Sequence, residues 1–104
     1  MKIWIDDVRQ PPNWELGNDS WFWATSVNSA INAIKYFEDW FRVELIDIDH
    51  DAGDYVYDGG DYIKVLDWLE ETGRNFPIRI HSMNPVGVEN MRRIIQRNGW
   101  TEVR

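Results

Sequence analysis

Acidic residues and both histidines of the chain lie at the ends of predicted strands. Residues 44–54, ELIDIDHDAGD, place four aspartates and a histidine directly after an apolar run. Asp6 and Asp7 follow another apolar run, and His81 and Ser82 follow a third. Gathered carboxylates repel one another unless they share a proton or a cation. Because carboxylate oxygens are hard ligands, the pattern predicts a site for Mg²⁺ or Mn²⁺ and chemistry on a phosphate group.

The pattern of apolar residues predicts the elements that must position these side chains. Period-two runs predict strands, and runs with helical spacing predict helices that begin after a cap at Thr25 or Ser26, near Tyr62 and after Asn84. Residues 9–20, RQPPNWELGNDS, are rich in turn formers and predict a loop. The predicted strands are 2–6, 21–25, 43–48, 77–81 and 100–104.

Alternating strands and helices predict an α/β fold with a mostly parallel sheet. We expect a single domain over 1–104, a three-layer sandwich with helices on both faces of a five-stranded sheet of order 2-1-3-4-5. The first helix of such a fold is replaced by the loop 9–20. Ligands of open parallel sheets bind beyond the carboxyl ends of the strands, which is where the aspartates and histidines fall.

Charge and composition exclude several classes of protein. The formal net charge is −7, and the acids are concentrated in residues 44–73, which carry ten acids and one lysine. Such a surface argues against broad binding of DNA. Residues 74–104 carry six arginines, which are expected to pair with the acidic segment or to meet an anionic substrate. Thiol chemistry is excluded because the chain has no cysteine. No run is apolar enough for a membrane span, so we expect a cytoplasmic protein.

Three motifs together give the chain a resemblance to a known family. KIWIDDVR, ELIDIDHDAGD and IRIHSMN are similar in placement to the acidic pair, the central aspartate and the Ser/Thr of response-regulator receiver domains. WIDDVR, DIDHDAGD, IHSMNPVG and ENMRRII resemble more closely the receiver-like family named for cyclic-phosphate processing. No Lys-Pro pair follows the last predicted strand, so ordinary phosphorelay is not expected.

The resemblance implies a role for each matching residue. Asp6 and Asp7 would be metal ligands, and Asp49 would be the central ligand or phosphate acceptor. Ser82 would contact the phosphoryl oxygens. The remaining matching residues would serve as acid, base or substrate contacts: His50, Asp51, His81 and Asn84.

Several residues have a structural alternative. His81 can equally be a buried, hydrogen-bonded histidine. Asp47 is expected to be compensated by a local ion pair. Arg9 can pair with the acidic pair or with a substrate phosphate. Trp21 and Trp23 are expected to pack in the core or at its edge, although they could stack a nucleobase.

Two functions follow, with a third less favoured. The first is metal-dependent processing, by hydrolysis or transfer, of a cyclic phosphate in a small molecule or at an RNA end, with Asp49, His50, His81 and Ser82 as catalytic residues. The second is a non-catalytic receiver-like module that binds a protein partner or a nucleotide signal. The third, a metal domain of the topoisomerase-primase type, requires a glutamate where the chain has the Asp6-Asp7 pair.

Overall fold

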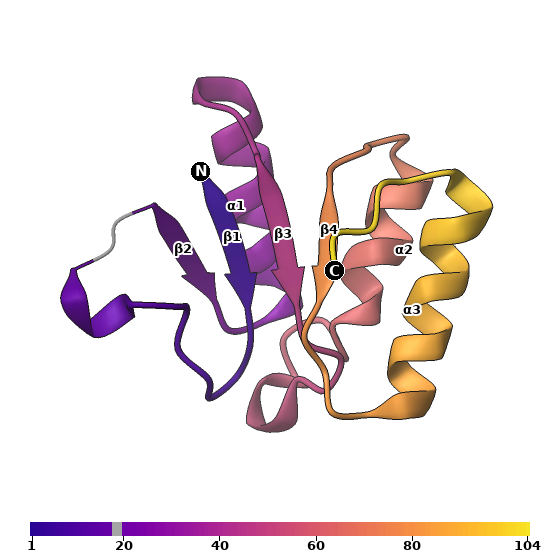
Figure 1. The fold of residues 1–104 in the computed structure, drawn as a ribbon, viewed down its shortest axis with the longest axis horizontal. Helices are drawn as coiled ribbons and strands as arrows, with labels where there is room; N and C mark the ends of the chain where they lie inside the picture. The colour runs from indigo at the N-terminus through magenta and orange to yellow at the C-terminus, as the bar shows by residue number, and fades with distance from the viewer. Residues whose placement is uncertain (18–19) are drawn as a thin grey trace.

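The computed structural model describes residues 1–17 and 20–104, so residues 18 and 19 of the predicted loop lie outside it. Four parallel strands form one sheet of order β2-β1-β3-β4, and all four run in the same direction (Figure 1). The receiver-like α/β fold expected from the sequence is confirmed. The strands are β1 (Lys2–Ile5), β2 (Trp21–Ala24), β3 (Leu45–Ile48) and β4 (Ile78–Ile80).

The expected fifth strand does not form, although its segment lies where the prediction placed it. The amide of Ile78 donates to the Thr101 carbonyl at 3.0 Å, and the amide of Val103 donates to the Ile78 carbonyl at 2.8 Å. These bonds produce one isolated parallel bridge between Ile78 and Glu102. Because β4 has only three residues, the ladder beside it ends after this single step.

The three helices are α1 (Val27–Trp40), α2 (Ile63–Glu71) and α3 (Pro85–Asn98). Ser26 caps α1, since its hydroxyl accepts from the Ser29 amide and the Ser29 hydroxyl accepts from the Ser26 amide. The Asn84 carboxamide oxygen caps α3 by accepting from the Gly87 amide at 3.0 Å. The sequence-based starts of α1 and α3 are therefore confirmed.

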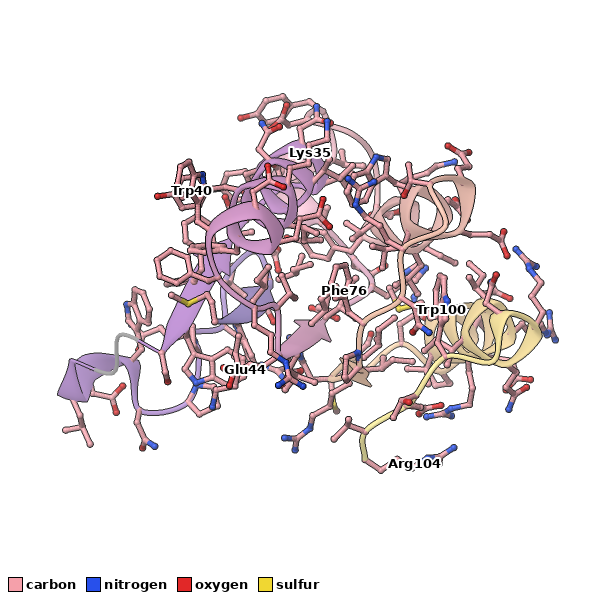
Figure 2. All side chains as sticks on the ribbon, turned by 90° about the horizontal axis from the view of Figure 1, so that it is seen from above. Lys35, Trp40, Glu44, Phe76, Trp100 and Arg104 are labelled. Carbon is pink, nitrogen blue, oxygen red and sulfur yellow. The ribbon has the colours of Figure 1, made fainter. Side chains whose placement is uncertain are left out.

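The expectation that helices cover both faces of the sheet is wrong for the described residues. α1 and α2 lie over the same face, and α3 packs beside α2 (Figure 2). In its described residues, the segment between β1 and β2 has no α-helix and contains the short 3-10 turn η1 (Trp14–Leu16), as the predicted loop required. That loop and the indoles beside it stand on the second face in place of a helix.

The apolar core lies between the sheet and the helices. Alternate strand residues such as Ile3, Ile5, Ile46 and Ile48 are fully buried there. Trp4 and Trp21 are buried too, with 6% and 8% exposure, but they lie outside this core cluster. They form a second, aromatic layer on the other face, where their rings meet edge to face at 5.6 Å.

Candidate metal and phosphate site

Strand register brings the ends of three strands to one level. Ile5 is in register with Ile48, and Ile48 is in register with Ile80. The next residues of these strands are Asp6, Asp49 and His81, so all three leave the sheet at its carboxyl edge (Figure 1). The predicted convergence at this edge follows from the parallel pairing.

Asp6, Asp7 and Asp49 form a compact group of carboxylates. One oxygen from each lies within 4.8 Å of the others. Oxygens bound to one Mg²⁺ lie about 3–4 Å apart, since each bond is about 2.1 Å long. Small side-chain movements would therefore allow this donor set to hold one such ion. Among the described residues, Asp7 and Asp49 have no cationic side chain within ion-pair distance.

Asp6 accepts three hydrogen bonds or contacts from neighbouring nitrogens, through both of its carboxylate oxygens. Its Oδ1 accepts hydrogen bonds from the backbone amides of Val8 and Arg9 at 2.9 and 2.8 Å. Burial alone would raise the pKa of Asp6, but these amides and His81 outweigh burial, so the pKa is lowered. Asp6 is therefore held as a carboxylate whether or not a cation is bound.

Asp7 lies in a less favourable environment. Burial raises the pKa of Asp7, and the charges of Asp6 and Asp49 raise it further. Gly53, with φ 55°, leaves the space that Asp7 occupies, because a Cβ at this position would lie 2.3 Å from Asp7 Oδ2. A bound cation would relieve this repulsion among the three carboxylates, as expected for a metal site.

His81 is held between two carboxylates. Its Nδ1 lies 2.6 Å from Asp47 Oδ1, and its Nε2 lies 2.9 Å from Asp6 Oδ2. Trp4 stacks on the ring, with centroids 3.9 Å apart and planes 5° from parallel. Because both nitrogens are engaged, this arrangement makes His81 a residue that positions Asp6. It also supplies the local partner expected for Asp47.

His50 belongs to a second hydrogen-bond network, which shares no partner with that of His81. Its Nδ1 lies 2.9 Å from Asp51 Oδ1, and Asn84 Nδ2 lies 3.4 Å from both oxygens of Asp51. The ring packs against the first turn of α3, since a Cβ on Gly87 would lie 2.4 Å from His50 Cγ. Nδ1 is thus occupied, which leaves Nε2 as the nitrogen that can face a substrate.

Arg9 and Ser82 have different surroundings from those expected. Arg9 forms no ion pair with the acidic pair; its amide binds Asp6, and its Nη1 lies 3.5 Å from the His81 carbonyl oxygen. The guanidinium is exposed at the rim and remains available to an anion. The Ser82 hydroxyl accepts from the Asn84 amide at 3.1 Å, so it shapes the turn into α3.

Four residues that support the site were not identified from the sequence. Gly53 and Gly87 provide the close approaches described above, and Trp23 Nε1 donates to the Asp6 carbonyl at 2.8 Å. Tyr62 is fully buried beneath the carboxylates and donates its hydroxyl proton to the Thr25 carbonyl at 2.6 Å. Burial, together with the charges of the three aspartates, raises the pKa of Tyr62.

The chain was compared with known families, curated proteins and solved structures. The family model described as the cyclic-phosphate processing receiver domain matches residues 1–97. Neither the curated proteins nor the solved structures yielded a match. In the described residues, no helix is long and apolar enough to cross a membrane. The match takes in β1 to β4 and almost all of α3, and with them every residue of the site, so the chain belongs to the family of cyclic-phosphate processing receiver domains.

Proposed function

We propose that the chain processes a cyclic phosphate in a reaction that depends on Mg²⁺ or Mn²⁺. The observation that carries this proposal is the convergence of Asp6, Asp7 and Asp49 with no cationic side chain paired to Asp7 or Asp49 in the described part of the chain. A cation held by these oxygens would supply positive charge that offsets the charge developing on the phosphoryl oxygens.

Hydrolysis of a cyclic phosphate adds one water to phosphorus and breaks one of the two ring ester bonds. The products are a phosphate monoester and a free hydroxyl group. One proton leaves the water, and one proton reaches the departing oxygen. We assign this proton transfer to Nε2 of His50, because Asp51 holds Nδ1 at 2.9 Å and fixes the ring.

His81 is given a positioning role. It holds Asp6 Oδ2 at 2.9 Å and is itself fixed by Asp47 and by the Trp4 ring. Arg9, exposed at the rim, is assigned to the phosphate oxygens. Ser82 and Asn84 keep a role through the turn that leads into α3, where backbone amides at the helix start favour an anion.

Turnover is tested with Mg²⁺ or Mn²⁺ and a panel of 2′,3′-cyclic and 3′,5′-cyclic nucleotides. We expect Asp49→Asn to lower the rate of monoester release by about 10²–10³-fold. Asp54→Asn is the matched control, because Asp54 lies in the same loop but outside the carboxylate group. Absence of turnover by the wild-type chain on every substrate, or full activity of Asp49→Asn, would contradict the proposal.

A second candidate function is binding without catalysis. Aromatic side chains at the end of α1 are exposed, with 55% for Tyr36, 72% for Trp40 and 62% for Phe41. Exposed aromatics of this kind favour contact with a protein partner.

Tryptophan fluorescence tests whether the chain binds a metal ion, and so distinguishes the metal-dependent enzyme from the binding module. Trp4 stacks on His81, and Trp23 donates to the backbone of Asp6, so two indoles contact the predicted ligand shell. We expect millimolar Mg²⁺ to change the emission of the wild-type chain but not of Asp7→Asn. Emission that is insensitive to Mg²⁺, together with absent turnover, would favour the binding module.

A further inference from the structure

The face of the sheet that carries no helix presents its own set of side chains. Residues in register on parallel strands project to the same side. Trp4 is in register with Trp23 and Asp47, and Asp47 is in register with Arg79. Since the neighbouring isoleucines belong to the core under the helices, these four side chains lie on the opposite face.

Only half of this face is covered. Trp4 is buried by the loop after β1, where its Nε1 donates to the Arg9 carbonyl at 2.7 Å. Trp14 meets Trp23 edge to face, with centroids 5.9 Å apart. Over β4, in contrast, Arg79 is exposed, and the end of the chain at Arg104 lies on this side of the sheet (Figure 2).

Three cations on this face have no ion-pair partner among the described residues: Lys2, Arg9 and Arg79. The Lys2 ammonium group lies 4.6 Å from the Trp21 ring centroid, and the Arg9 guanidinium lies by the His81 carbonyl. Three arginines on the helix side are instead paired to glutamates in bidentate fashion: Arg74–Glu38, Arg92–Glu102 and Arg97–Glu70.

The three cations follow a bent path that begins at the candidate site, runs along β4 from Arg9 to Arg79 and then crosses the sheet to Lys2. His81, beside the Arg9 guanidinium, is two residues beyond Arg79 on the same strand, or about 7 Å along it. Lys2 and Arg79 are separated by two strand intervals and two residues, or about 12 Å between Cα atoms. This spacing is too wide for a single pyrophosphate group and suits a chain of successive phosphodiesters.

We propose that this face binds the strand of an oligonucleotide whose terminal cyclic phosphate enters the carboxylate site. The proposal rests on the proposed function for the reacting end, and it adds a binding surface formed by Lys2, Arg9 and Arg79. The charge of this surface is opposite to that of the chain as a whole, whose net charge is −7. Contact is with the backbone, since Trp4 and Trp21 are buried and the half-buried Trp23 is packed against Trp14.

Binding is measured without turnover, by fluorescence anisotropy, with a labelled tetraribonucleotide that ends in a 3′-phosphate. A second tetramer has the same bases and uncharged methylphosphonate linkages. We expect the charged tetramer to bind about tenfold more tightly at low salt. Its log affinity should fall with log salt concentration with a slope of about −2, as expected for three contacts to a single strand.

The variant Arg79→Gln isolates this surface from the catalytic group. We expect it to reduce the salt slope by about 0.7 and to lower affinity for the charged tetramer only. Arg93→Gln is the matched control, because Arg93 is an exposed arginine of α3, 3.8 Å from Glu89. Both variants should turn over a mononucleoside 2′,3′-cyclic phosphate as the wild-type chain does.

The outcomes distinguish this inference from the proposed function. Equal affinity for the two tetramers, or equal loss in Arg79→Gln and Arg93→Gln, would overturn the oligonucleotide surface even if mononucleotides are cleaved. Selective loss in Arg79→Gln supports the surface, and it does so whether or not any cyclic phosphate is turned over.

Discussion

Carboxylates are treated in opposite ways at two regions of this molecule. On the helix side, Glu38, Glu70 and Glu102 each meet one arginine through two or more hydrogen bonds. At the carboxyl edge of the sheet, Asp6, Asp7 and Asp49 meet one another. The arginines neutralise the paired glutamates, whereas the negative charge of the three gathered aspartates is not fully neutralised by neighbouring side chains. The difference distinguishes the candidate site from the rest of the described surface without reference to any single motif.

The surroundings of the two groups explain how the gathered carboxylates persist. Asp6 relies on two backbone amides and on His81, none of which neutralises Asp7 or Asp49. The helix-side glutamates rely on side-chain cations, joined at Glu70 by the carboxamide of Asn98. Backbone amides fix the position of a carboxylate without adding a full positive charge, so they organise a site and leave it able to attract a cation.

The largest expected difference between the regions is in activity. We expect Asp49→Asn to lower turnover of a cyclic phosphate by about 10²–10³-fold. The reason is that the variant would weaken binding of the cation that offsets the charge developing on the phosphoryl oxygens in the transition state. Glu70→Gln removes a hydrogen-bonded carboxylate from the other region and should leave turnover unchanged. Steady-state rates measured with Mg²⁺ compare the two variants. A similar loss of turnover in both would show that the aspartate group has no special role in the reaction.

The next difference is in stability. Asp47 is 1% exposed and its partner His81 is almost enclosed, so Asp47→Ala leaves a buried ring nitrogen without a partner. We expect a loss of about 3 kcal/mol in the free energy of unfolding. Arg92→Gln, which breaks a pair with Glu102 that is more exposed, at 27% for the arginine side chain, should cost clearly less. Urea denaturation followed by fluorescence compares the two, and the reverse ranking would refute the buried network.

Much of this arrangement was predictable because parallel strands and capped helices have local signals. The chain order of strands and helices, the loop that replaces the first helix, and the starts of α1 and α3 at Ser26 and Asn84 all follow from the sequence. Convergence of Asp6, Asp49 and His81 follows from parallel strand ends. The family resemblance drawn from the short motifs is confirmed by the match over residues 1–97.

The remaining features depend on contacts between distant residues. Trp4 and His81 are far apart in the chain, and nothing in either motif signals that their rings stack. The helix-free face was not expected, because the rule for crossovers assumes that the first strand connection contains a helix. The last segment was predicted to be a strand from its composition, yet the short β4 leaves it a single bridge.

Two glycines, one at the carboxylate group and one on the helix side, allow a more specific comparison of the two regions. The expected change in stability is smaller than that of Asp47→Ala. Gly53 and Gly73 have similar dihedrals, φ 55° and 68°, but a Cβ would strike Asp7 at the first and meet nothing within 4 Å at the second. Both alanine variants should lose about 1–2 kcal/mol of stability from the left-handed backbone. Only Gly53→Ala should also weaken Mg²⁺ binding, measured by fluorescence titration. Equal Mg²⁺ affinity in the two variants would show that Asp7 does not need the space.

The smallest expected effect is the response of the helix-side pairs to acid. The hydrogen bonds from Arg97 and Asn98 lower the pKa of Glu70 to about 2 from its ordinary value of 4.5. A carboxyl whose pKa is depressed in the folded state stabilises the fold above its unfolded value and loses that contribution as pH falls through its folded value. The difference in urea midpoint between the wild-type chain and Glu70→Gln should therefore be constant from pH 7 to about pH 5 and shrink below about 4.5. The pair is exposed and screened by solvent, so the difference is small, and it should shrink further in high salt.

A difference that grows as the solution is acidified would show that Glu70 is not stabilised by Arg97, and the contrast between paired and gathered carboxylates would then rest on Glu38 and Glu102 alone.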